Sequence, residues 1–184
     1  MKRALVIGCA ADVWADVAKA RELGEYEKTY CVKYAGVHWP GESFVWCTLH
    51  PEFQDRYDAE RAKLGLGRVY EVVAPPPGEL GEHGKKGKID RRVSYRWRGM
   101  NASASSGIYG AKVALDDGYD RVVLAGVPMT REGGHFVRGK PWDYWLSFMA
   151  GFKLAKPHLM GKVRSVSGYT KEQLGEPTSE WLYT

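Results

Sequence analysis

Two loops of the sequence carry residue types that suit a phosphate-bearing ligand. Residues 8–12, Gly-Cys-Ala-Ala-Asp, follow an apolar run, and residues 103–107, Ser-Ala-Ser-Ser-Gly, lie at the start of an apolar stripe of helical period. Small side chains let a phosphate or ribose approach the backbone, and a helix N-terminus adds free N–H groups. A plain turn also favours small residues, and one Ser is an ordinary helix cap. Each loop is therefore open to a second interpretation, in which its small residues serve only the turn or the helix cap.

A third loop carries a histidine that could do acid–base chemistry. His135 follows a Gly pair in the Gly-rich stretch 126–140. An imidazole can act as a general base near neutral pH. Arg131 and Arg138 flank it and could neutralise a leaving phosphate. His50 follows another apolar run and is expected to line the same cleft. An ordinary surface histidine is the alternative for His135.

The candidate site differs from the best-known phosphate and metal motifs. Neither loop has the G-x-G-x-x-G pattern of a dinucleotide site, and no loop ends in the Gly-Lys-Ser/Thr of a Walker A motif. No His, Cys or carboxylate pair has the spacing of a catalytic zinc site, and no Gly-x-Ser-x-Gly elbow predicts a hydrolase triad. We assign no metal ligands. The candidate nucleotide-binding residues are Gly8, Ala10, Asp12, Asn101, Ser105, Ser106 and Gly107.

The elements that must position these loops alternate along the chain. Short apolar runs predict strands at 3–8, 29–33, 44–48, 68–73, 121–125 and 162–166. Helical patterns start near Asp12, span 51–63 and 104–118, and run from Pro141 to Pro157, and a capping pattern at 170–173 predicts a last short helix. We expect one α/β domain over residues 1–184, a three-layer Rossmann-like fold with a mainly parallel sheet. Ligands bind such sheets at the carboxyl ends of the strands.

A basic stretch follows the fourth predicted strand. Residues 78–92 are polar and Gly-rich, which predicts a mobile loop. Seven cations fall within residues 85–98, and they are Lys85, Lys86, Lys88, Arg91, Arg92, Arg96 and Arg98. Such a cluster indicates either a patch that meets phosphates or a solvated surface loop. Four aromatic residues would let it bind nucleic acid, or would simply pack beneath it, and they are Tyr34, Trp39, Tyr95 and Trp97.

The composition excludes several classes of protein. The chain has 184 residues, a formal charge of +5, 44% hydrophobic and 12% aromatic residues, which excludes disorder as its main state. No apolar run approaches the roughly 20 residues that a membrane-spanning helix needs. The chain has three cysteines, which is an odd number, and no two of them have C-x-x-C spacing. We therefore expect reduced thiols and a cytoplasmic protein.

Part of the sequence resembles a known group of enzymes. The matching residues are 101–109 (N-A-S-A-S-S-G-I-Y), the helix pattern at 111–115, residues 118–120 (G-Y-D) and residues 122–127 (V-V-L-A-G-V). They resemble Rossmann-like nucleotide-using transferases, in particular bacterial CMP-sugar sialyltransferases and hydroxymethylpterin pyrophosphokinase-like proteins. They also look like small phage or prophage proteins. The sequence departs from the sialyltransferase pattern in its first loop and at Pro128, which stands where an acidic residue is common.

The resemblance implies specific roles for the three loops. The loop after the first strand and the Ser-Gly helix start would hold the nucleotide, and His135 would be the base that acts on the acceptor hydroxyl. His135 would then be essential for turnover but not for nucleotide binding. We expect a glycosyltransferase-like enzyme with a nucleotide or nucleotide-sugar donor, with or without magnesium, and no tightly bound cofactor. The alternative is a non-catalytic protein that binds or sequesters nucleotides or nucleic acid. The sequence leaves the oligomeric state open.

Overall fold

One parallel sheet of seven strands organises the chain. The computed structural model describes residues 1–41, 43–79, 87–100, 105–140, 142 and 145–184. The strand order is β5-β4-β3-β2-β1-β6-β7, and each neighbouring pair is parallel. The α/β prediction with a mainly parallel sheet is confirmed. The strands are β1 (Arg3–Ile7), β2 (Lys28–Val32), β3 (Phe44–Cys47), β4 (Tyr70–Ala74), β5 (Arg91–Arg92), β6 (Arg121–Ala125) and β7 (Val163–Ser165).

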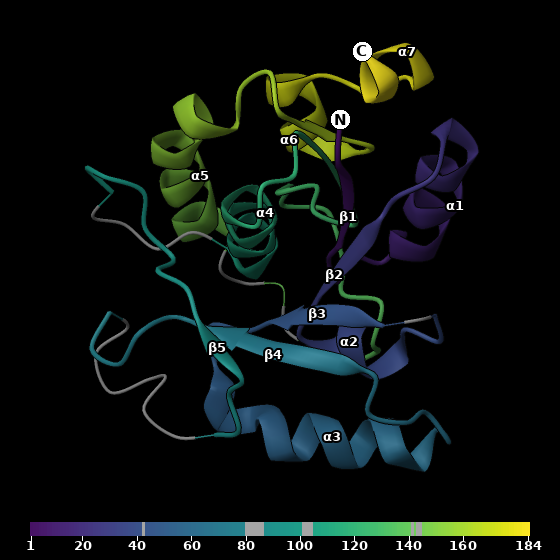
Figure 1. Ribbon diagram of the computed structural model, residues 1–184, viewed down its shortest axis with the longest axis vertical. Coiled ribbons are helices and arrows are strands. Elements are labelled where there is room, and N and C mark those ends of the chain that lie inside the picture. The colour runs from purple at the N-terminus through teal and green to yellow at the C-terminus, as the bar shows by residue number, and fades with distance from the viewer. Residues whose placement is uncertain (42, 80–86, 101–104, 141, 143–144) are drawn as a thin grey trace.

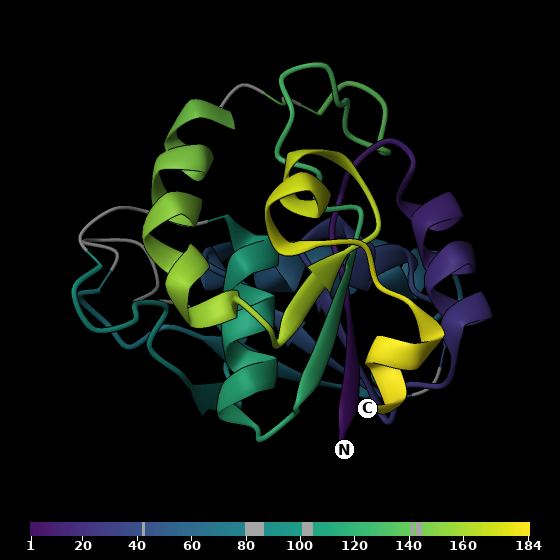
Figure 2. The same cartoon turned by 90° about the horizontal axis from the view of Figure 1, so that it is seen from above.

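Helices flank the sheet (Figures 1 and 2). Both views show α4 and α5 on one side of β1 and α1 on the other. The short 3-10 turn η1 leads directly into α3. The elements are α1 (Val13–Leu23), α2 (Tyr34–His38), η1 (Pro51–Phe53), α3 (Gln54–Lys63), α4 (Ser106–Asp116), α5 (Trp145–Leu159), α6 (Gly168–Leu174) and α7 (Ser179–Tyr183).

Small and branched apolar residues form the packed centre of the fold, where α4 lies against β1 and β6. β1 and β6 are buried over their last four residues, which is typical of strands covered on both faces. α4 is buried from Ser106 to Ala114 and lies against both strands. Gly110 allows this contact, because a Cβ there would lie 2.9 Å from Cγ1 of Val6. Close packing of α4 places its N-terminus at the carboxyl ends of the strands.

The structure corrects several predicted boundaries. α5 continues past Pro157 to Leu159, because a proline so near the end removes one donor while Ala155 and Leu159 stay buried. Thr170 does not cap the last predicted helix. It lies inside α6, where its hydroxyl donates to the Val127 carbonyl at 2.6 Å. β5 falls within the segment predicted to be a loop, whose residues 80–86 lie outside the described residues.

No helix in the part of the chain that the structure describes is both long and apolar enough to span a membrane.

A buried carboxylate joins three elements at the carboxyl edge of the sheet. Asp16 of α1 is 4% exposed. Its Oδ2 accepts the backbone N–H of Gly126 at 2.9 Å and the hydroxyl of Ser167 at 2.5 Å. Gly126 follows β6 and Ser167 precedes α6, so one side chain ties α1 to both.

We expect Asp16→Ala to lower the free energy of unfolding by about 3 kcal/mol, because it leaves a buried N–H and a hydroxyl without an acceptor. Urea denaturation measures the change. Asp12→Ala is the matched control, since the exposed Asp12 side chain makes no capping hydrogen bond, and it should change stability by less than about 0.5 kcal/mol. Equal effects of the two variants would contradict this role for Asp16.

Candidate functional site

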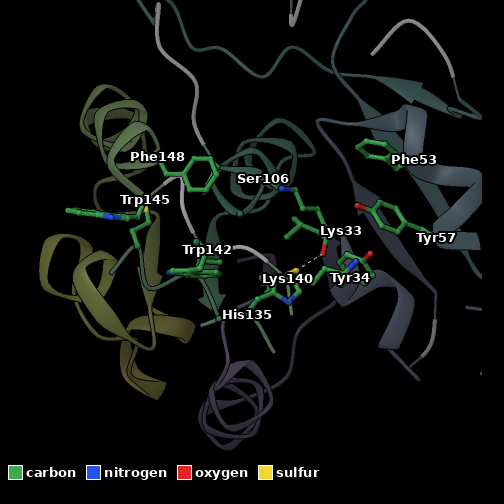
Figure 3. Close-up of a pocket in the computed structure, with 18 of the residues that line it drawn as sticks. Lys33, Tyr34, Phe53, Tyr57, Ser106, His135, Lys140, Trp142, Trp145 and Phe148 are labelled. Carbon is green, nitrogen blue, oxygen red and sulfur yellow. Dashed lines mark hydrogen bonds between the residues drawn. The ribbon is translucent and has the colours of Figure 1, made fainter. Parts of the chain in front are cut away.

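A cavity of about 350 Å³ lies at the carboxyl ends of β1, β2 and β6. Its walls come from α3 on one side and α5 on the other (Figure 3). This is the position predicted for a ligand in an open parallel sheet. The lining residues are Gly8, Cys9, Val32, Lys33, Tyr34, Phe53, Arg56, Tyr57, Ser105, Ser106, Gly107, Gly126, Val127, Met129, His135, Lys140, Trp142, Trp145 and Phe148.

The N-terminus of α4 opens into this cavity. Ser105 is the helix cap, and its hydroxyl accepts the N–H of Ile108 at 3.3 Å. Ser106 and Gly107 belong to the first turn, whose N–H groups have no acceptor within a helix. Ser105, Ser106 and Gly107 all line the cavity, as an anion-binding role requires. Asn101 lies outside the described residues.

The loop at residues 8–12 does not offer a phosphate the free backbone N–H groups that were expected of it. The N–H of Ala10 donates to the carbonyl of Gly126 at 3.2 Å, and that of Ala11 donates to the carbonyl of Gly134 at 2.7 Å. These donors are therefore used by the chain itself and are not free for a phosphate. Gly8 lines the cavity, whereas Ala10 and Asp12 do not. The structure gives the N-terminus of α4 the better geometry for an anion.

Three cations surround the cavity. They are Lys33, Arg56 and Lys140, and none of the described lining residues is Asp or Glu. Arg56 donates to the Tyr34 hydroxyl at 3.1 Å, and Nζ of Lys140 lies 4.6 Å from the centroid of the Tyr34 ring. Arg56 also pairs with Glu60 at 2.9 Å, so Lys33 and Lys140 are the lining cations whose charge most favours an anionic ligand. Sequence reasoning predicts no role for Lys33 and considers Tyr34 only for nucleic-acid stacking, although both directly follow β2 and fall under the same carboxyl-end rule.

Two of the lining residues have an unusual backbone. Lys33 has a φ of 45° and Met129 a φ of 51°, and they are the described non-glycine residues with positive φ. L-residues adopt such sparsely populated conformations at a cost of roughly 1–3 kcal/mol each. Such costs concentrate at functional sites, where the surrounding structure holds a side chain in a required position. Here they follow β2 and β6, at the edge where the cavity lies.

His135 reaches the cavity because its loop is fastened to the end of β1. Ala10 and His135 form an isolated antiparallel bridge, and the N–H of Phe136 donates to the carbonyl of Cys9 at 3.1 Å. Nδ1 of His135 accepts the N–H of Val137 at 2.9 Å. Burial, with Lys33 and Lys140 nearby, lowers the pKa of His135 to about 4. The ring is therefore neutral at pH 7.

Aromatic side chains form the opposite walls. Phe53 and Tyr57 lie on the α3 side, whereas Trp142 and Phe148 lie on the α5 side (Figure 3). Flat aromatic faces stack on planar rings such as nucleobases. The walls and the cations together suit a ligand with a planar ring and a negative group. The free thiol of Cys9 has a raised pKa of about 11 because of its burial, so it is not a nucleophile at pH 7.

The other predicted site residues do not line the cavity. Arg131 and Arg138 are exposed on the 126–140 loop, and their roles stay predictions. Nδ1 of His50 lies 3.0 Å from Oε1 of Glu52, outside the lining residues. No group of three His, Cys, Asp or Glu residues within the described ranges could hold a metal ion. A requirement for magnesium stays a prediction.

Several cations of the basic stretch bind the chain itself. Arg91 forms ion pairs with Glu71 and Asp117, each at 2.7 Å. Arg92 donates to the carbonyl of Pro75 and Arg96 to that of Glu79. Lys85 and Lys86 lie outside the described residues. These contacts favour a structural role for Arg91, Arg92 and Arg96 over a role in binding phosphate.

The floor of the cavity depends on glycine. A Cβ on Gly8 would lie 2.1 Å from the carbonyl oxygen of Gly126. We expect Gly8→Ala to destabilise the protein by about 3 kcal/mol, because two strand ends would have to separate. Gly67→Ala is the control, since an added Cβ there meets nothing within 4 Å. Thermal and urea unfolding compare the two, and a Gly8→Ala protein as stable as the control would disprove the close approach.

Comparison with known proteins supports the fold. No protein-family model matches the sequence, and no curated protein sequence matches it. Three solved structures of the sialyltransferase CstII are similar over 97% of this chain, each with a TM-score of 0.62. CstII from Campylobacter jejuni with the substrate analogue CMP-3FNeuAc is 10% identical, with 88% of that chain covered.

The other two structures contain cytidine nucleotide. CstII with a trisaccharide acceptor and CMP is 10% identical, with 87% of that chain covered, and CstII with cytidine-5'-monophosphate is 11% identical, with 86% covered. At such low identity the likeness shows a shared fold. It agrees with the predicted resemblance to sialyltransferases, whereas the resemblances to hydroxymethylpterin pyrophosphokinase-like proteins and to phage proteins stay predictions. The chain therefore has the fold of sialyltransferases, with a cationic cavity at the carboxyl edge of its sheet.

Proposed function

We propose that the protein is a glycosyltransferase that uses a nucleotide-sugar donor, with a cytidine nucleotide as the first candidate. The observation that carries this proposal is the cavity, which joins the N-terminus of α4, three cations and two aromatic walls. Its shape and charge suit a nucleobase and a phosphate. The fold shared with CstII, whose structures hold CMP and a CMP-sugar analogue, supports the choice of donor.

Each group of lining residues has a role in this proposal. Ser106 and Gly107 bind phosphate at the helix N-terminus, where N–H groups and the helix dipole favour an anion. Gly8 leaves room for the ligand beside the strand end. Transfer breaks the bond between the sugar's anomeric carbon and a phosphate oxygen, and forms a bond to an acceptor hydroxyl. Lys33 and Lys140 stabilise the charge that develops on the departing phosphate.

A screen of nucleotides tests the proposal directly. We expect CMP and CMP-sugars to raise the melting temperature more than UDP, ADP or GDP, with and without magnesium. A ligand present at a hundred times its dissociation constant adds about 2.7 kcal/mol of stability, which corresponds to a shift of roughly 5–10 °C for a chain of this size. A differential scanning fluorimetry series measures it.

The screen also separates the two functional hypotheses. If no nucleotide shifts the melting temperature, the glycosyltransferase proposal is rejected. Binding of short single-stranded nucleic acid, with an affinity that falls steeply as salt rises, would then support the nucleic-acid alternative.

The two lysines should recognise the phosphate and not the nucleoside. We expect Lys33→Gln and Lys140→Gln each to weaken CMP binding about 10-fold, as loss of one charge-assisted hydrogen bond predicts. Cytidine binding should stay unchanged. Lys153→Gln is the control, because Lys153 is exposed on α5 and does not line the cavity. Calorimetry measures the affinities, and equal losses for CMP and cytidine would remove the lysines from the phosphate site.

A further inference from the structure

The hydrogen bond to Nδ1 determines which imidazole nitrogen of His135 is available to a ligand. A backbone N–H can only donate, so Nδ1, which accepts the N–H of Val137 at 2.9 Å, carries a lone pair. In a neutral ring the proton then resides on Nε2. The backbone bridge between Ala10 and His135 holds the residue in place beside the cavity. The ring therefore offers the cavity a donor, and its acceptor nitrogen is already in use.

This geometry opposes a role as general base. A base at Nε2 needs the other tautomer, in which an Nδ1–H would face the N–H of Val137 with no acceptor between them. The protonated product of that step has the same clash. It would also place a third positive charge close to Lys33 and Lys140. Each stage of base catalysis would thus lose a hydrogen bond that the folded chain makes.

We propose that His135 is a neutral hydrogen-bond donor that binds an oxyanion of the ligand through Nε2–H, and not a general base. The oxyanion is the nucleotide phosphate if the proposed function holds, and the inference rests on that function for the ligand's identity. Lys33 and Lys140 attract the same anion, and none of the described lining residues is a carboxylate that could accept the Nε2 proton instead. The acceptor's proton then has another destination, the departing phosphate, whose second pKa is about 6.

The charged and titratable groups around the ring agree with this role. Lys33 and Tyr34 face it from the end of β2 and the start of α2, His38 from the end of α2, and Lys140 from its own loop. The Tyr34 ring lies edge to face at 5.5 Å from the His135 ring. Cys9 lies on the β1 side and stays a thiol. No carboxylate in this set stabilises an imidazolium, and burial, Lys33 and Lys140 disfavour protonation of the ring more than the backbone of Val137 favours it. Figure 3 shows His135, Lys140, Lys33 and Tyr34 close together, between the aromatic side chains of the two walls.

The tautomer can be measured without any ligand. Long-range ¹H–¹⁵N spectra of protein labelled at histidine distinguish a protonated ring nitrogen from an unprotonated one, and the His135→Gln spectrum assigns the signals. We expect an unprotonated Nδ1, a protonated Nε2 and no titration between pH 5 and 8. A proton on Nδ1, or a titration near pH 6.5, would overturn the proposal.

Amide substitutions test the function of the donor. The side-chain N–H₂ of Gln can replace Nε2–H, whereas that of the shorter Asn cannot reach this position. We expect His135→Asn and His135→Ala to weaken CMP binding about 10-fold, or about 1.4 kcal/mol, and His135→Gln to retain affinity within about 3-fold. Cytidine binding should not change in any variant. Unfolding curves confirm that the variants are folded.

The results separate this inference from the proposed function. A general base predicts unchanged CMP binding in all three variants and equal loss of turnover in Gln, Asn and Ala, and that pattern would reject the donor role. If wild-type protein binds no nucleotide, the proposed function is rejected. Inorganic phosphate is then the probe, and loss of its binding in His135→Ala, with rescue in His135→Gln, still supports the donor. Equal phosphate binding in wild type and His135→Ala rejects it.

Discussion

The close approach of β1 and β6 at their carboxyl ends is the constraint on which the site depends. The N–H of Gly8 donates to the carbonyl of Ala125 at 2.8 Å, and the space beside Gly8 is filled by the carbonyl of Gly126. Gly126 in turn has a φ of 68° and lies against Val13 of α1. The Asp16 carboxylate takes the N–H that this turn exposes. Two strand ends and a helix are thereby locked together beneath the cavity.

The other parts of the site are held in place by contacts with this junction. The N-terminus of α4 lies against Val127, directly after the turn, since a Cβ on Gly107 would be 2.6 Å from Cγ1 of Val127. The loop that carries His135 is paired with the main chain of residues 9–11. The helix N–H groups and the imidazole thus reach the cavity from segments held by backbone contacts. Only the cations and the aromatic walls depend on longer side chains.

The sequence predicted the framework better than the chemistry. Strand periodicity and the Ser-Gly helix start are local signals, so the sheet and the position of Ser106 could be read directly. The donors of the first loop are used by Gly126 and Gly134, more than a hundred residues away, and no local pattern reveals that. α2 is a single turn in which Gly36 lies against Trp46, so it has no period to detect. Without α2, the prediction does not place Lys33 and Tyr34 at the cavity.

Electrostatics explains why these missed residues matter. Lys33 and Lys140 lie near a half-buried imidazole and repel one another, and the described lining residues offer no carboxylate to offset them, whereas Arg56 is paired with Glu60 at 2.9 Å. Burial and the two lysines keep His135 neutral, so the ring adds no positive charge to this repulsion. A bound phosphate would reduce it further, because it adds negative charge where the cations and the α4 N-terminus converge. A nucleoside without phosphate would fill the aromatic walls but leave the repulsion in place. Under the proposed function the site would discriminate by charge as well as by shape, and a protonated His135 would add positive charge that none of the described lining carboxylates could offset, because there are none among them.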